Sequence, residues 1–115
     1  MTGAAGSEAG NVVLVVVPSE LGRPRPGVIV QADEFTKDLS TIFVCPISSD
    51  VQDGLPLRPI IEAKPSNGLR LRSQIMTDKM IVLRHDRVRS VIGQIDSTTS
   101  EQLDRALLVV LGLAQ

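Results

Sequence analysis

Hydrophobic positions fall in short runs along most of the chain, and most of these runs are rich in valine and isoleucine. Glycine and proline separate the runs over the first four fifths of the sequence, which is typical of an all-β barrel or sandwich. The pattern predicts strands at residues 11–17, 27–31, 41–47, 57–63, 73–83 and 91–95. The strand at 73–83 could be interrupted near residues 77–79.

The end of the chain follows a different period. Its apolar residues are spaced three and four apart, which places them on one face of a helix; they are Leu103, Ala106, Leu107, Val110 and Leu113. The preceding segment, residues 96–101, supplies the signal for a helix start, and within it Thr98 and Glu101 have the spacing of a capping box. We therefore expect a C-terminal helix, and a helical turn or loop connection at residues 33–38.

Length and composition limit the chain to one unit. It has 115 residues, the length of one domain, so we expect a flexible leader at residues 1–10 and a single domain at residues 11–115. The first ten residues lack the charged and apolar regions of a secretory signal. The apolar runs at 12–18 and 106–113 are far shorter than the roughly 20 residues that cross a bilayer. The expected location is the cytoplasm, with no membrane segment.

The charge balance and the cysteine and histidine counts exclude one class of nucleic-acid-binding protein and two kinds of structural cross-link. Twelve Lys and Arg residues against thirteen Asp and Glu residues give a net charge of -1, which excludes a histone-like protein held on nucleic acid by bulk charge. One cysteine and one histidine cannot supply a disulfide framework or a structural zinc site, which needs four such ligands. We expect no metal and no cofactor, and a reduced, buried Cys45.

The polar loop at residues 19–26 is the first candidate for chemistry. Arg25 stands between Pro24 and Pro26, whose rings fix the backbone on both sides. A guanidinium on a stiff support suits a phosphate, because less conformational entropy is lost on binding. Glu20, five residues earlier, could act beside it as a base. The alternatives are a surface ion pair for Arg25 and a solvated Glu20.

Two other polar loops follow, at residues 48–54 and 64–72. Ser48 and Ser49 stand at a strand end, where a hydroxyl donates to a bound anion or caps a turn. No Gly-x-Ser-x-Gly motif surrounds them, so a serine-hydrolase triad is not supported. Basic residues cluster near the loops and could track phosphates or form a solvated rim. Because the chain has no Trp or Tyr and only two Phe, it lacks the platforms of a passive RNA-coating module.

Taken in order, several segments resemble the MazF/PemK family of toxin endoribonucleases. No single piece is specific, but the resemblance extends over residues 10–114 and rests on residues 11–15, 23–31, 43–50, 68–70, 74–79, 92–95 and the closing helix at 103–113. It implies an SH3-like small β-barrel of the CcdB/MazF type with a C-terminal helix. It also implies a homodimer, metal-independent cleavage of single-stranded RNA, and a cognate antitoxin whose disordered segment lies over the dimer.

The resemblance also assigns roles by position. Arg25 matches the family's catalytic arginine, Glu20 a loop carboxylate, Ser48 a position that usually holds threonine, and Asp78 an acidic residue implicated in the reaction or in RNA contact. RNA contacts are expected at Arg23, Ser49, Arg70, Arg72 and Lys79. Two positions depart from the family: Asn11 replaces a carboxylate in an Ala-Gly-Asn sequence that also lacks the usual basic residue, and Met76 replaces an arginine that some members carry.

The chemistry that these residues suit is attack of a ribose 2′-hydroxyl on the adjacent phosphorus. Glu20 is the candidate base, and Arg25 with Ser48 the candidate stabilisers of the developing charge. A CcdB-like gyrase poison is one alternative, although that family acts through a tryptophan-bearing C-terminus and this chain has no Trp. A catalytically silent RNA-binding or antitoxin-binding relative is another, favoured by Asn11 and Met76.

Overall fold

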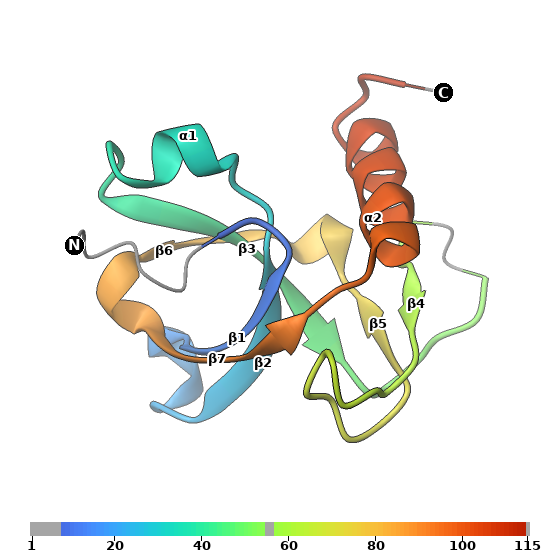
Figure 1. The fold of residues 1–115 in the computed structure, drawn as a ribbon, viewed down its shortest axis with the longest axis horizontal. Coiled ribbons are helices and arrows are strands. Elements are labelled where there is room, and N and C mark those ends of the chain that lie inside the picture. Colours follow the sequence, from blue (N-terminus) through green and yellow to red (C-terminus); the bar gives the residue numbers. More distant parts are fainter. Residues whose placement is uncertain (1–7, 55–56, 115) are drawn as a thin grey trace.

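The computed structural model describes residues 8–54 and 57–114, except for the side chain of Glu20 (Figure 1). Strands dominate, as the sequence predicts: β1 (Asn11–Val16), β2 (Pro24–Ile29), β3 (Thr41–Ser48), β4 (Ile60–Ile61), β5 (Ser73–Ile75), β6 (Ile81–Arg84) and β7 (Val88–Gln94). The helices are α1 (Asp33–Thr36) and α2 (Ser97–Val110), with 3-10 turns η1 (Pro18–Glu20), η2 (Thr77–Lys79) and η3 (His85–Arg87).

The strands form one curled antiparallel sheet in the order β4-β5-β3-β2-β1-β7, with β6 added to β3. Strand β3 is the branching point of the sheet. Its first half pairs with β6, from Thr41 opposite Arg84 to Val44 opposite Ile81, and its last residue Ser48 lies opposite Gln74 of β5. Figure 1 shows the sheet curling into a half-barrel with α2 standing to one side, beside β4 and β5. The predicted barrel with a C-terminal helix is confirmed.

The core lies on both faces of this sheet. Successive residues of a strand point to opposite faces, so Val12 packs with Cys45 and with Leu103 of α2, while Val13 packs with Ile29 and Val44 on the other face. Burial on both faces explains why β1 is a continuous run of apolar residues rather than an alternating one.

Several element boundaries differ from the predicted ones. Strand β2 begins at Pro24 rather than at residue 27, and the predicted strand 57–63 shrinks to Ile60–Ile61 because its flanks form hydrogen bonds outside a strand ladder. The predicted strand 73–83 is interrupted by η2, and β7 begins at Val88 rather than at residue 91. Residues 33–36 form the expected helical turn α1.

Helix α2 starts with a different cap from the one expected. Asp96 is the N-cap, and its Oδ1 accepts a hydrogen bond from the Thr99 backbone N–H at 2.8 Å. Thr98 lies inside the helix, so the predicted capping box is wrong, because the extended backbone of Asp96 already places a strong acceptor two residues earlier. Leu103 and Ala106 are buried as predicted, whereas Leu113 lies beyond the helix and is 71% exposed. In the described part of the chain, no helix has the length and apolarity needed to span a bilayer.

Candidate active site

A groove with a volume of about 560 Å³ opens where β2, the end of β3 and the loop before β5 meet. One side of the groove carries Arg25 and Pro26 of β2. The end of β3, from Pro46 to Ser48, and the next residue, Ser49, also line the groove. Residues Gly68 to Leu71 lie along the groove as well, and Met76 and Ile92 contribute apolar surface. The groove therefore brings Arg25, Ser48, Ser49 and Arg70 together from three separate parts of the sequence.

The strand position of Arg25 follows from its neighbours. Pro24 and Pro26 lie opposite Val16 and Leu14 of β1, and Arg25 lies opposite Val15. The two proline rings fix φ near the value of extended backbone, and pairing with a buried strand holds the segment in place. Arg25 itself is exposed and lines the groove. The structure thus presents the guanidinium from a stiff support, as the sequence predicts.

Ser48 performs the turn-capping role that was one of its two predicted alternatives. It is the last residue of β3, and its Oγ accepts a hydrogen bond from the Asp50 N–H at 3.1 Å. A serine hydroxyl that accepts one bond can still donate its own hydrogen. Because Ser48 also lines the groove, capping the turn and donating to an anion in the groove are compatible.

The loop of residues 62–72, called here the 62–72 loop, is held by an asparagine that sequence reasoning missed. Asn67 is 4% exposed. Its Nδ2 donates to the Glu62 carbonyl at 2.8 Å, and its Oδ1 accepts from the backbone N–H groups of Lys64 at 3.1 Å and Leu69 at 3.0 Å. The signal in the sequence was the dipeptide Asn67-Gly68, a common turn pair.

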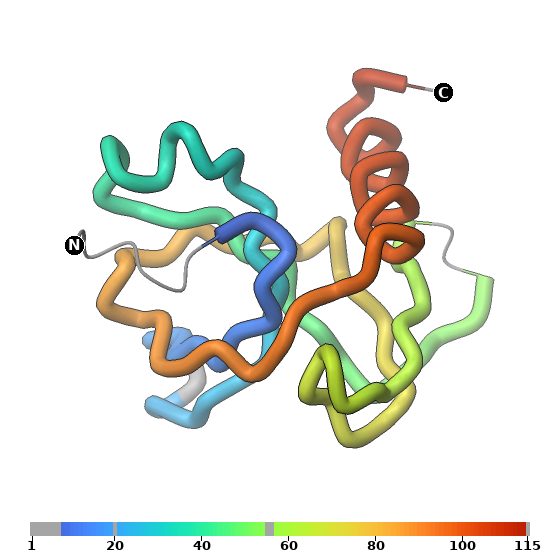
Figure 2. Tube along the Cα trace, in the orientation of Figure 1, coloured from blue at the N-terminus to red at the C-terminus, as the bar shows by residue number. Residues whose placement is uncertain are grey.

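The same loop is attached to the sheet. The Gln94 N–H donates to the Ser66 carbonyl at 2.9 Å, and Figure 2 shows the loop running beside the end of β7. A Cβ at Gly93 would overlap the carbonyls of Ser66 and Asn67, and one at Gly68 would overlap the Ile92 backbone. Two glycines therefore let the backbones of the loop and β7 lie directly against each other.

Asp78 lies outside the set of residues that line the groove. Arg58 binds it through two hydrogen bonds, Nε to Oδ1 and Nη2 to Oδ2, each 2.9 Å long, and Arg58 Nη1 donates to Gln74 Oε1 at 2.8 Å. This arginine lowers the pKa of Asp78 and keeps it ionised. The geometry gives Asp78 a structural role, and a part in the reaction stays a prediction. Arg58 was not singled out from the sequence, because its partner lies 20 residues away.

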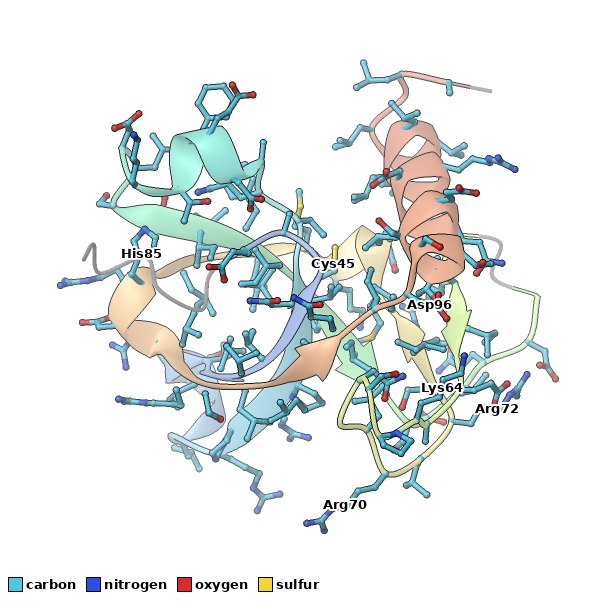
Figure 3. The ribbon with its side chains drawn as sticks, in the orientation of Figure 1. Cys45, Lys64, Arg70, Arg72, His85 and Asp96 are labelled. Carbon is cyan, nitrogen blue, oxygen red and sulfur yellow. The ribbon has the colours of Figure 1, made fainter. Side chains whose placement is uncertain are left out.

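The remaining predicted contacts are spread around the groove. Ser49 and Arg70 line it, and Figure 3 shows Arg70 at the outer end of the 62–72 loop, away from Arg72. Arg72 forms an exposed ion pair with Glu62 at 2.9 Å. Arg23 and Lys79 are exposed and are not among the groove-lining residues. Glu20 ends the η1 turn, but its side chain lies outside the described residues.

The structure shows the surroundings of Asn11 and Met76, the two residues that depart from the expected family pattern. Asn11 is buried at the end of β1, where its Oδ1 accepts from Gln94 Nε2 at 3.0 Å and its Nδ2 donates to Glu8 at 2.8 Å. It joins β1 to β7 and is not among the groove-lining residues. Met76 does line the groove, so this part of the surface is apolar where some members carry an arginine.

The buried cysteine is not suited to chemistry. Burial, with a smaller effect from the negative charge of Asp78, raises the pKa of the Cys45 thiol to about 12. The thiolate, which is the reactive form, is therefore scarce at neutral pH. Within residues 8–54 and 57–114, no group of three or more His, Cys, Asp or Glu side chains is arranged to hold a metal ion.

Comparisons with known proteins agree with this fold. The family model described as the PemK-like, MazF-like toxin of type II toxin–antitoxin systems matches residues 8–111. The chain belongs to this family and is a toxin of that class. The predicted family is confirmed, and the comparisons do not favour the CcdB-like alternative.

Several of the similar proteins come from mycobacteria. A probable endoribonuclease MazF of Mycolicibacterium smegmatis is 37% identical over 93 residues, which cover 81% of this chain and 84% of the relative. Toxin MazF-mt6 of Mycobacterium tuberculosis has a similar fold, with a TM-score of 0.78 and 20% identity over 91% of this chain and 99% of that one. An endoribonuclease solved with its cognate antitoxin, from a mycobacterial species, has a TM-score of 0.79 and 16% identity over 94% and 97%.

Proposed function

We propose that the protein is a metal-independent endoribonuclease that cleaves single-stranded RNA in the groove between β2, β3 and the 62–72 loop. The observation that carries this proposal is the convergence of Arg25, Ser48, Ser49 and Arg70 on one groove. These side chains provide two guanidinium groups and two hydroxyls. Such groups donate hydrogen bonds to the oxygen atoms of a phosphodiester. The name of the relative from Mycolicibacterium smegmatis, a probable endoribonuclease, supports the same activity.

The reaction uses the 2′-hydroxyl of the RNA as the nucleophile. This oxygen attacks the adjacent phosphorus while its proton passes to a base, for which we propose Glu20. The bond from phosphorus to the 5′ oxygen breaks, and that oxygen takes up a proton. The products are a 2′,3′-cyclic phosphate and a free 5′-hydroxyl.

Arg25 and Ser48 stabilise the negative charge that grows on the phosphoryl oxygens. Because the pKa of an arginine is above about 12, electrostatic stabilisation suits Arg25 better than proton donation. DNA lacks the attacking hydroxyl, so the groove would bind it without cutting it. Ser49 and Arg70 contact the RNA inside the groove in this proposal, and Arg23, Arg72 and Lys79 extend the basic surface outside it.

We infer two protein partners and a location. Helix α2 exposes Leu108 and Val109, and Leu111 follows it; these apolar side chains suit a second copy of the chain, and a monomer in sedimentation at micromolar concentration would contradict the homodimer. The antitoxin in the mycobacterial complex supports a cognate antitoxin here. An acidic, disordered segment would be attracted to the arginines beside the groove. RNA cleavage inside cells implies the cytoplasm.

The test is incubation of the pure protein with a mixed-sequence RNA, with and without EDTA. Cleavage that is unaffected by EDTA and yields cyclic phosphate ends supports the proposal, and the Arg25→Ala variant supplies the inactive control. Cleavage that EDTA abolishes contradicts a metal-independent reaction. Binding of RNA without cleavage indicates the silent relative. Inhibition of DNA gyrase without any effect on RNA indicates the CcdB-like alternative.

A further inference from the structure

The 62–72 loop forms part of the groove but contains no helix or strand of its own between β4 and β5. A loop without regular structure keeps a fixed shape only where its backbone groups have partners. The Lys64 carbonyl accepts from the backbone N–H groups of Asn67 and Gly68. The Asn67 side chain adds partners on both arms of the loop, at Glu62 and Lys64 on the arm leaving β4 and at Leu69 on the arm that returns to β5. One buried amide therefore ties the two arms together.

The position of the loop is set by contact with β7. Gln94 binds the Ser66 carbonyl, and the glycines at 68 and 93 allow the two backbones to meet. From this contact the chain runs directly into Leu69, Arg70 and Leu71, which line the groove. A shift of the loop would thus move Arg70 relative to Arg25 and Ser48, although none of the groups that hold the loop would touch the reacting phosphate.

We propose that Asn67 is a positioning residue for RNA binding, which holds the Leu69–Leu71 side of the groove at the correct distance from Arg25 and Ser48. This inference rests on the proposed RNA-cleaving function. Asn67 acts on binding rather than on the chemical step, because Arg25 and Ser48 are held by β2 and β3 independently of the loop. A change that weakens ground-state and transition-state binding equally raises KM and leaves kcat unchanged.

The experiment compares wild type with Asn67→Ala, Asn67→Asp and Ser66→Ala. It uses an RNA oligonucleotide that the wild type cleaves, and the same oligonucleotide with a 2′-deoxy sugar at the cleaved position, which binds without reacting. Asp keeps an oxygen for the Lys64 and Leu69 N–H groups but cannot donate to Glu62. Ser66→Ala is the matched control, because Ser66 contacts β7 through its backbone carbonyl and not its hydroxyl.

For Asn67→Ala we expect KM and the Kd of the deoxy analogue to rise about tenfold, with kcat unchanged. The Lys64 and Leu69 amides should exchange hydrogen faster than in the wild type. Asn67→Asp should retain the slow exchange and give an intermediate KM, and Ser66→Ala should match the wild type. If Asn67→Ala does not fold, Asn67→Asp and Gly93→Ala carry the test, because an alanine at 93 forces the loop off β7 and should raise KM with unchanged kcat.

Unchanged KM and Kd in a folded Asn67→Ala protein, while the wild type cleaves RNA, would overturn the inference and leave the proposed function standing. A folded Gly93→Ala protein with wild-type KM would likewise overturn the inference and leave the proposed function standing. A fall in kcat with unchanged KM would also overturn it, because it would assign Asn67 to the chemical step. If the wild type neither binds nor cleaves RNA, the proposed function fails, and this inference fails with it.

Discussion

Arg58 holds Asp78 with two parallel hydrogen bonds of 2.9 Å, and the same guanidinium reaches the fully buried Gln74. The Arg58 side chain is only 10% exposed, so the pair ties the segment before β4 to the η2 turn. Thr77 adds a hydrogen bond from its hydroxyl to the Leu57 carbonyl. Asp78, which the family resemblance places in the reaction or in RNA contact, therefore also forms an ion pair that joins these two segments.

The Arg58–Asp78 pair predicts a shared loss of stability. Asp78→Asn and Arg58→Ala should each lower the free energy of unfolding by about 1 kcal/mol or more, and the double variant should lose less than the sum. Urea unfolding measures this. The kcat of Asp78→Asn tests the part in the reaction that the resemblance assigns to Asp78, and a wild-type kcat would leave only the structural role. A large fall in kcat for a stable Asp78→Asn protein would instead place Asp78 in the reaction.

Arg25→Ala should reduce cleavage by about 10²- to 10³-fold, because one donor to the developing charge is lost. The fold should persist, since Arg25 is exposed and its strand is held by backbone pairing with β1. Single-turnover cleavage and circular dichroism check the two halves of this prediction. Arg25→Lys should restore little activity, because a point charge cannot reproduce the planar fork. Normal cleavage by a folded Arg25→Ala protein would remove the mechanism.

Ser48 offers a test of hydroxyl donation. Ser48→Ala should lower kcat, whereas Ser48→Thr should keep it, because threonine retains the hydroxyl and tolerates a strand position. Both variants can be compared by cleavage of one RNA oligonucleotide at saturating concentration. Equal kcat values for the alanine and threonine variants would show that Ser48 only caps the turn at Asp50.

Asp96 makes the start of α2 sensitive to acid. The hydrogen bond from the Thr99 N–H lowers the pKa of Asp96 from 3.8 to about 2, with a further contribution from Lys64. Because the pKa is lower in the folded state, the charged cap stabilises the protein above about pH 4, and this contribution is lost as the pH falls through 2. The advantage of wild type over Asp96→Asn in urea unfolding should therefore shrink between pH 4 and pH 2. A constant difference over this interval would contradict the assignment.

Salt dependence separates the two arginines of the 62–72 loop. In the inactive Arg25→Ala background, Arg70→Ala should flatten the plot of log affinity against log salt by about 0.7 if Arg70 contacts one phosphate of single-stranded RNA. Arg72→Ala should have a smaller effect, because Glu62 already neutralises Arg72. Titration of fluorescent RNA at several salt concentrations measures both slopes. Unchanged slopes for both variants would show that the loop does not touch phosphate.

The parts of the fold that could be predicted are those in which burial leaves a periodic pattern. The valines of β1 and the helical spacing from Leu103 are of this kind, and both elements are present. The proline-flanked Arg25 and the strand-end Ser48 could also be singled out, because local backbone constraints mark them. Both line the groove.

What could not be predicted depends on partners distant in the sequence. The Arg58–Asp78 pair and the contact of Ser66 with Gln94 each arise from tertiary geometry that no local pattern records. For the same reason, Arg70 and Arg72 look equivalent in the sequence. In the structure one lines the groove, and the other is paired with Glu62.

Because the 62–72 loop is attached to β7, the groove can be completed only at a late stage of synthesis. Arg25 and Ser48 emerge early, but the strand that carries Gly93 and Gln94 is the last strand to be made. Contacts between distant segments form only after the entropy of closing the intervening chain has been offset. A growing chain that ends before Val88 has no surface on which Ser66 and Asn67 can lie. The complete groove therefore exists only when translation of the domain is almost finished.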